Sequence, residues 1–278
     1  MNELIRFDRV SYGYSAQKQV LQQISLSVYQ GDFIAIIGGN GSGKTTLAKH
    51  LNGLYKPTHG TVTVAGRDTR SLSVAELSRF VTYCYQNPDH QIFQSTIYEE
   101  VAFGPKNMGL SGTELEERVT EALRAVGLEQ MREAEPYFSS KGTRQKIAVA
   151  SILAMKPEVI VLDEPTTGLD HRGVRDIMEL LRRLHRAGHT IIVVTHDMKL
   201  VAEYAWRVLV MHQGSLLYDG TPREVFTRPD VWEKAQVEPP AVYRFGVAAG
   251  WSAPVPLTLE EAKERLAEER VKHETCPS

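Results

Sequence analysis

The sequence predicts an α/β fold in which helices cover both faces of a parallel sheet. Short apolar runs rich in β-branched residues, at 33–37, 159–162 and 190–194, alternate with longer segments of helical pattern. A run in which every residue is apolar is typical of a strand that is buried on both faces. Strands that alternate with helices favour parallel pairing, because the helices supply the crossover connections.

The N-terminal part of the chain has a different pattern, which indicates antiparallel strands. Over residues 1–30, apolar and polar residues alternate, as expected for a sheet with one solvated face. The buried strand 33–37 then ends in a glycine-rich loop. A helix is expected from Thr45 to about Leu54, and Pro57 stops it.

The middle of the chain predicts a helical insertion between strands of the parallel sheet. Residues 60–66 and 80–85 have the pattern of further strands, and the stretch from about 96 to 155 is mostly helical. A helix is expected at about 174–187, between the apolar runs 159–162 and 190–194. We therefore expect a parallel core interrupted by a helical subdomain at about 95–156.

Proline-rich segments indicate a boundary after the main domain. We expect one domain over 1–232 and a small C-terminal extension over 233–278. Thr258 and Glu261 fit a capping box at the start of a late helix, which we expect to serve dimerisation or docking. The alternative is a charged and frayed tail.

Composition and charge exclude several classes of function. The formal net charge is −2, so no global basic field favours nucleic acid. The first residues carry no apolar signal region, and no apolar run approaches the roughly 18 residues of a membrane span. A role in a membrane process would therefore require docking on a membrane partner.

A phosphate-binding loop lies between the predicted strand 33–37 and the helix that follows. The glycines allow backbone N–H groups to approach phosphate oxygens at the positive end of a helix. In this pattern Lys44 reaches the β and γ phosphates and Thr45 ligates Mg²⁺, so the loop predicts binding of ATP with Mg²⁺. The residues concerned are Gly38, Gly39, Asn40, Gly41, Ser42, Gly43, Lys44 and Thr45, followed by Thr46.

Two acidic residues follow the apolar run 159–162. Asp163 ends the predicted strand and could hold the Mg²⁺ shell, and Glu164 comes directly after it. A carboxylate at this point can take the proton of an attacking water, a role worth on the order of 10²–10⁴-fold in rate. Together with the upstream phosphate loop, the pair predicts a P-loop NTPase with a RecA-like parallel core and Glu164 as the general base.

The order of motifs over nearly all of residues 1–230 resembles that of ABC-transporter ATPases. The resemblance implies that Tyr14 stacks on adenine and that Gln86 of the Q-loop senses Mg²⁺ and the γ-phosphate. It further implies that Asp170 is the D-loop aspartate and that His196, in "VVTHD", is the switch histidine that contacts the γ-phosphate and the attacking water. In this family, two ATPase domains close around two ATP molecules.

The signature motif of the family is altered in this chain. The family usually has Leu-Ser-Gly-Gly-Gln where this sequence has "SSKGT" at 139–143. Ser140 and Gly142 are retained, and a hydroxyl and an unobstructed backbone N–H are the groups that cradle phosphate. Lys141 replaces a glycine and Thr143 replaces a glutamine. We hypothesise that the signature still works; the alternative is a chain that pairs with a different ATPase and leaves one composite site weak.

A finer resemblance is to the ATPases of cobalt-type and energy-coupling-factor importers. The segments "QNPDHQIFQSTIYEEVAFGPKNMGL" and "LAMKPEVIVLDEPTTGLD" carry it. It implies uptake of a vitamin or a transition-metal ion, a peripheral location on the cytoplasmic face of the cell membrane, and a second ATPase subunit, identical or different. A transmembrane scaffold subunit and a substrate-binding membrane subunit would complete the transporter, and the latter would select the cargo.

Two other classes of ATPase share these motifs. DNA-repair and chromosome-organising ATPases carry a long coiled coil between the phosphate loop and the signature, and the stretch from Gln86 to Ser140 is too short for one. The near-neutral charge also argues against a DNA clamp. Translation-linked factors have two tandem ATPase domains, whereas one set of motifs is present here.

Overall fold

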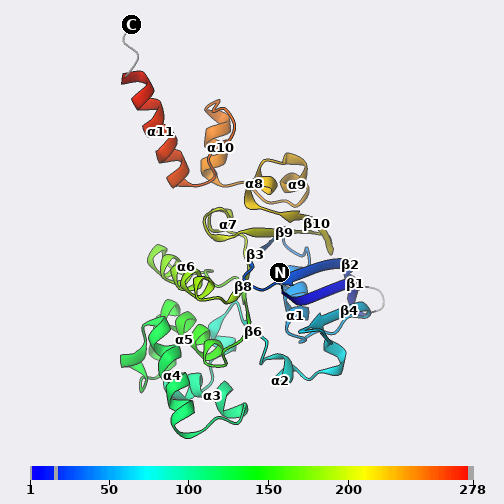
Figure 1. The fold of residues 1–278 in the computed structure, drawn as a ribbon, viewed down its shortest axis with the longest axis vertical. Coiled ribbons are helices and arrows are strands. Elements are labelled where there is room, and N and C mark those ends of the chain that lie inside the picture. The colour runs from blue at the N-terminus through cyan, green and yellow to red at the C-terminus, as the bar shows by residue number, and fades with distance from the viewer. Residues whose placement is uncertain (1, 16–17, 275–278) are drawn as a thin grey trace.

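A parallel sheet flanked by helices forms the centre of the molecule (Figure 1). The computed structural model describes residues 2–15 and 18–274; Cys276 lies outside them. Within these residues the sheet has six strands in the order β10-β9-β3-β8-β7-β6, and all but β10 run parallel. The strands are β3 (Phe33–Ile37), β6 (Val81–Cys84), β7 (Val159–Asp163), β8 (Thr190–Val194), β9 (Arg207–His212) and β10 (Ser215–Gly220).

The four strands β3, β6, β7 and β8 are buried along their whole length, which confirms the interpretation of the apolar runs. In β7 the side chains alternate between two cores. Val159 and Val161 pack on the face that carries α1 (Lys44–Leu51), while Ile160 and Leu162 pack on the face that carries the inserted helices. This alternation aims Asp163 at the α1 face, because side chains two residues apart on a strand share a face.

The N-terminal strands form a separate antiparallel sheet, as predicted. In the described part of the chain it has the order β2-β1-β4-β5 and packs its apolar side chains into the core that also holds α1. The strands are β1 (Glu3–Ser15), β2 (Lys18–Tyr29), β4 (His59–Val64) and β5 (Arg67–Asp68).

Three α-helices occupy the stretch for which a helical insertion is predicted. They pack on one another and on the parallel sheet at the green end of the molecule in Figure 1. Helix α6 starts earlier than the expected position 174, because the Asp170 carboxylate caps it. The helices here and beside the sheet are α2 (Val74–Leu77), α3 (Ile97–Asn107), α4 (Gly112–Val126), α5 (Lys141–Leu153), α6 (His171–Arg186) and α7 (Met198–Tyr204). Short 3₁₀ segments lie at Thr69–Ser71, Pro88–His90, Glu129–Met131 and Pro136–Phe138.

The C-terminal part of the chain projects from the parallel sheet on the β10 side (Figure 1). It comprises α8 (Pro222–Phe226), α9 (Pro229–Lys234), α10 (Ala241–Ala248) and α11 (Leu259–Glu274). Leu257 is buried in the core beside β3 and β9, so this side chain ties the extension to the sheet.

Only half of the capping box predicted for α11 is present. The Thr258 hydroxyl accepts a hydrogen bond from Glu261 N at 3.2 Å, as expected. The Glu261 carboxylate instead accepts from Leu257 N at 2.8 Å and from Arg223 at 2.7 Å. The Glu261 carboxylate therefore binds Arg223 of α8 in place of the backbone N–H of Thr258. This ion pair connects α11 to α8.

Candidate nucleotide-binding site

The loop between β3 and α1 has the backbone that the phosphate-loop pattern predicts. Gly38, Gly41 and Gly43 have φ values of 146°, 75° and 103°, which L side chains rarely adopt. A Cβ at Gly38 would collide with the carbonyl oxygen of Met211. The loop therefore needs glycine both for its turns and for its close packing against β9.

Lys44 begins α1 and bridges the mouth of this loop. Its Nζ donates hydrogen bonds to the carbonyl oxygens of Gly38 and Gly39, at 2.8 and 2.9 Å. Burial lowers the pKa of the Lys44 ammonium, and the nearby charges of Glu164 and Asp163 act in the opposite direction. A cation is thus held between the loop and two carboxylates, where phosphate oxygens could reach it.

The carboxylates lie at the end of β7, at the edge of the sheet where the loop also lies. Glu164 has a φ of 49°, so the chain turns sharply out of the strand at this residue. Its Oε2 lies 2.7 Å from His196 Nδ1 and accepts a hydrogen bond from the Thr167 hydroxyl at 3.3 Å. The Glu164 side chain is 13% exposed and His196 is 70% exposed, so the histidine covers the acid from the solvent side.

A cavity of about 390 Å³ brings most of the predicted residues together. Thr45, Gln86 and Asp163 all line it, and hydroxyl, amide and carboxylate oxygens suit Mg²⁺. Within residues 2–15 and 18–274 there is no group of three or more His, Cys, Asp or Glu side chains that could hold a metal ion. Mg²⁺ does not require such a group, because it is usually bound through one or two carboxylates together with waters and substrate phosphates. The lining residues are Tyr14, Lys18, Val20, Asn40, Gly41, Gly43, Lys44, Thr45, Thr46, Gln86, Asp163, Glu164 and Val194.

Tyr14 stands at the rim of this cavity. The residue is 55% exposed, its hydroxyl lies 3.0 Å from the Thr46 hydroxyl, and its ring contacts Tyr12 and Tyr55 edge to face. Lys18 lines the cavity as well and is not among the predicted residues. Its position across the β1–β2 hairpin from Ser15 could have indicated it, because that pairing brings it close to Tyr14.

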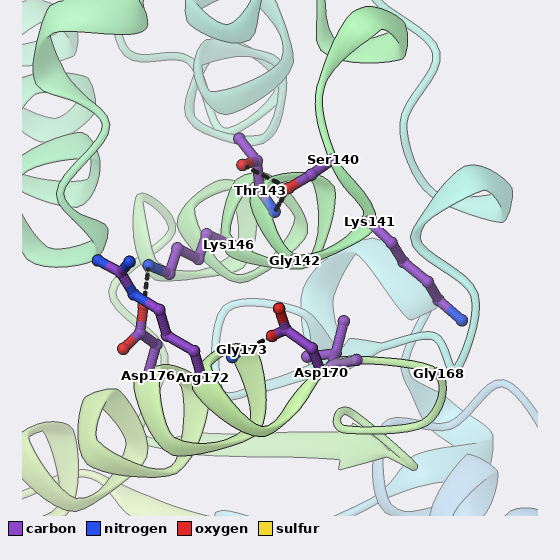
Figure 2. A pocket seen from close by; sticks show the side chains of 11 residues that line it. Ser140, Lys141, Gly142, Thr143, Lys146, Gly168, Asp170, Arg172, Gly173 and Asp176 are labelled. Atoms are coloured by element: carbon purple, nitrogen blue, oxygen red, sulfur yellow. Dashed lines mark hydrogen bonds and ion pairs between the residues drawn. The ribbon is translucent and has the colours of Figure 1, made fainter.

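The altered signature lies in a second cavity, of about 470 Å³, between the starts of α5 and α6 (Figure 2). The Ser140 hydroxyl caps α5 by accepting from Thr143 N at 3.2 Å, and it also lies 3.0 Å from the Thr143 hydroxyl. Asp170 caps α6 by accepting from Gly173 N at 2.7 Å. A Cβ at Gly142 would have only the Ser140 hydroxyl within 4 Å, at 3.9 Å, so the space above this glycine is open in the chain.

Lys141 extends away from Ser140 and runs along Gly168 (Figure 2). Two other cations line the same cavity and are not among the predicted residues. Lys146 forms an ion pair with Asp176 at 2.9 Å, and Arg172 comes from the first turn of α6. Lys146 lies one helical turn after Gly142 on α5, so helical spacing could have indicated it. Arg172 lies two residues after the cap residue Asp170, so its place in the first turn of α6 could have indicated it.

The structure therefore distributes the predicted residues over two separate cavities. The phosphate loop, Tyr14, Gln86 and the two β7 carboxylates surround the first, and Ser140, Gly142 and Asp170 line the second. His196 lines neither and reaches the first through Glu164. No helix in residues 2–15 and 18–274 is long and apolar enough to cross a membrane.

Known proteins resemble this chain in sequence. The family model described as "ABC transporter" matches residues 21–167. An ABC transporter ATP-binding protein of Caldanaerobacter subterraneus is 50% identical over 86% of this chain, which spans only 42% of that relative's length. The energy-coupling factor transporter ATP-binding protein EcfA of Methanocaldococcus jannaschii is 46% identical over 83% of this chain and 84% of its own length.

Solved structures resemble the chain in fold. CbiO1 of Clostridium perfringens, described as part of the ABC transporter complex CbiONQ, has a TM-score of 0.78 and 34% identity, covering 90% of this chain and all of that one. A dimeric ATP-binding cassette in a post-hydrolysis state with ADP and Pi has a TM-score of 0.71 and 29% identity, covering 79% of this chain and 99% of that one. The family model and these relatives show that the chain belongs to the ABC transporter family, as an ATP-binding and ATP-hydrolysing domain.

Proposed function

We propose that this chain powers a membrane importer of the energy-coupling-factor or cobalt type by closing as a dimer around two ATP molecules. The observation that carries the proposal is the split of the predicted residues between two cavities. The first cavity holds the phosphate loop and the carboxylates, while the signature residues line the second. A complete site then requires the second cavity of another ATPase subunit, identical or different.

The chemistry we propose uses the geometry of the first cavity. Lys44 and the loop N–H groups bind the β and γ phosphates of ATP. Mg²⁺, held by Thr45, Asp163 and Gln86, would neutralise phosphate charge. Glu164 accepts the proton of the attacking water, and the contact from His196 at 2.7 Å keeps its carboxylate oriented.

The altered signature keeps the groups that a phosphate needs. The Ser140 oxygen accepts from Thr143 N and can also accept from the Thr143 hydroxyl, which leaves its own hydrogen free to donate to a phosphate oxygen. Gly142 presents its backbone N–H beneath open space, and Lys141 is turned onto Gly168. We therefore favour a working signature over a weakened composite site.

An exposed aromatic surface supports docking on a transmembrane subunit. Phe93 and Phe103 contact each other edge to face with ring centroids 4.8 Å apart, and Tyr137 donates from its hydroxyl to the Ile92 carbonyl. Phe138, beside Tyr137, is 88% exposed. Solvent-exposed aromatic rings grouped in this way are typical of protein interfaces. Docking there would place the chain at the cytoplasmic face of the membrane, and a separate membrane subunit would select a vitamin or a transition-metal ion.

Glu164→Gln tests the proposal. The amide cannot accept the proton, so we expect turnover to fall by roughly 10²–10⁴-fold and the ATP-bound dimer to accumulate. Steady-state hydrolysis and light scattering with Mg²⁺ and ATP measure the two effects. The control is Glu158→Gln, an exposed glutamate just before β7, which should leave both unchanged. Unchanged turnover in Glu164→Gln would remove this residue from the base role, and a variant that stays monomeric with ATP would contradict the sandwich.

A further inference from the structure

Tyr83 brings a phenol hydroxyl to the predicted cation ligand Asp163. In the β6–β7 ladder Tyr83 is paired with Val161, two residues before Asp163. Paired residues of neighbouring strands and residues two apart on one strand share a face of the sheet. Tyr83 and Asp163 therefore lie on the same face, and the length of the tyrosine side chain spans the remaining step along the strand.

The contact between them is short and buried. The Tyr83 hydroxyl donates to Asp163 Oδ2 at 2.7 Å. Tyr83 is 7% exposed and Asp163 is 5% exposed, so little water competes for this bond. The Tyr85 ring packs edge to face on the Tyr83 ring with centroids 5.2 Å apart, which limits the positions the phenol can take.

We propose that Tyr83 is a positioning residue for the Mg²⁺ site, an inference that rests on the proposed function. One carboxylate oxygen of Asp163 is engaged by the phenol, which leaves Oδ1 for the cation shell beside Thr45 and Gln86. Without the phenol, Asp163 gains freedom to rotate toward the Lys44 ammonium, the cation that must remain available for phosphate. Tyr83 thus keeps the metal ligand and the phosphate-binding lysine apart.

Tyr83→Phe, made in the whole 278-residue chain, tests this inference. The change removes the hydroxyl and keeps the ring. The affinity for Mn²⁺, used as the metal probe with saturating non-hydrolysable ATP analogue, is measured by electron paramagnetic resonance. We expect Mn²⁺ binding to weaken by about 10–100-fold, as is usual when a hydrogen-bond partner of a metal ligand is lost. Binding of the analogue in EDTA should stay unchanged, which also shows that the variant is folded.

Two further variants define the outcome. Tyr85→Phe makes the same chemical change on the adjoining ring and should leave Mn²⁺ affinity as in the wild type. In an Asp163→Ala background, Tyr83→Phe should cause no further loss, because residue 163 then has no oxygen to accept the phenol's hydrogen bond. Equal Mn²⁺ affinity of Tyr83→Phe and wild type, or an added loss in the Asp163→Ala background, would overturn the inference. Failure of the wild type to bind the analogue would instead contradict the proposed function.

Discussion

Gly142→Ala should raise the stability of the chain while it impairs the function of the signature. Gly142 lies in the first turn of α5 at a helical backbone conformation, and a methyl group on its Cα would meet only the Ser140 hydroxyl, at 3.9 Å. Alanine therefore fits without a clash and gains helix propensity, worth roughly 0.5–1 kcal/mol. For a chain of this size, that gain should raise the melting temperature by about 1–4 °C.

The effect on turnover has the opposite sign. In the proposed dimer, a phosphate of the ATP held by the other subunit approaches through the open space above Gly142, and a methyl group there would block the backbone N–H. A hydrogen bond to a charged group contributes about 1.5–3 kcal/mol, so its loss should lower turnover by roughly 10–100-fold. Steady-state hydrolysis and thermal unfolding of the same preparation measure the two effects together.

Thr113→Ala is the matched control, because Thr113 is the second residue of α4, as Gly142 is of α5, and its side chain is exposed. It should also gain helix propensity, by a few tenths of a kcal/mol, and leave turnover unchanged. A Gly142→Ala variant with normal turnover would refute the assignment of this surface to phosphate. A Gly142→Ala variant that melts below wild type would show that the space above the glycine is filled.

Two further predictions concern stability. Burial lowers the pKa of His50, whose Nδ1 contacts the Thr46 carbonyl at 2.8 Å and whose Nε2 has no partner in the described structure. Because the folded-state pKa of His50 lies below the unfolded value of about 6.5, the free energy of unfolding is highest above that pH and falls as the pH decreases below it. Acidification to about pH 5.5 should therefore lower the melting temperature of the wild type more than that of His50→Leu. Equal shifts of the two melting temperatures would contradict this prediction. Arg207 pairs with Asp219 at 2.7 Å and with Asp32 at 3.1 Å, and all three side chains are only partly exposed. Arg207→Met leaves both carboxylates without their cation and should cost about 2–3 kcal/mol in urea unfolding. A loss below roughly 0.5 kcal/mol would show that the two carboxylates are solvated without it.

The strands of the parallel core could be predicted because their signal is local. β3 is apolar throughout, β7 is apolar up to Asp163, and β8 is apolar after Thr190, and burial on both faces demands such runs. The hairpin of β9 and β10 was not predicted, although its turn has positive φ at both Gln213 and Gly214. Asparagine or aspartate before glycine marks such turns, and glutamine does not. Helix α10 was not predicted either, because most of its residues are apolar and no polar face marks a helical period.

The phosphate loop and the β7 carboxylates could be located for the same local reason, since each belongs to a continuous stretch at a strand end. The contacts that complete the site join residues far apart in the chain. The bond from Tyr83 to Asp163 depends on which strand lies beside β7, and the contact of Glu164 with His196 depends on the order of β7 and β8 in the sheet. Composition and periodicity do not reveal which strands are neighbours in the sheet, so neither contact could be predicted from them.

The two unusual residues of the signature are accommodated within the chain itself. Thr143 is bonded to Ser140, and the Lys141 side chain runs along Gly168, where a Cβ would lie 2.5 Å from the lysine Nζ. Gly168 also has a φ of 73°, so the loop before Asp170 favours glycine for its backbone as well as for this packing. The side chain added at 141 therefore uses space that glycine leaves at 168. Because the lysine stem joins the signature to the loop before α6, a ligand that displaces Lys141 must also disturb the loop that leads to Asp170.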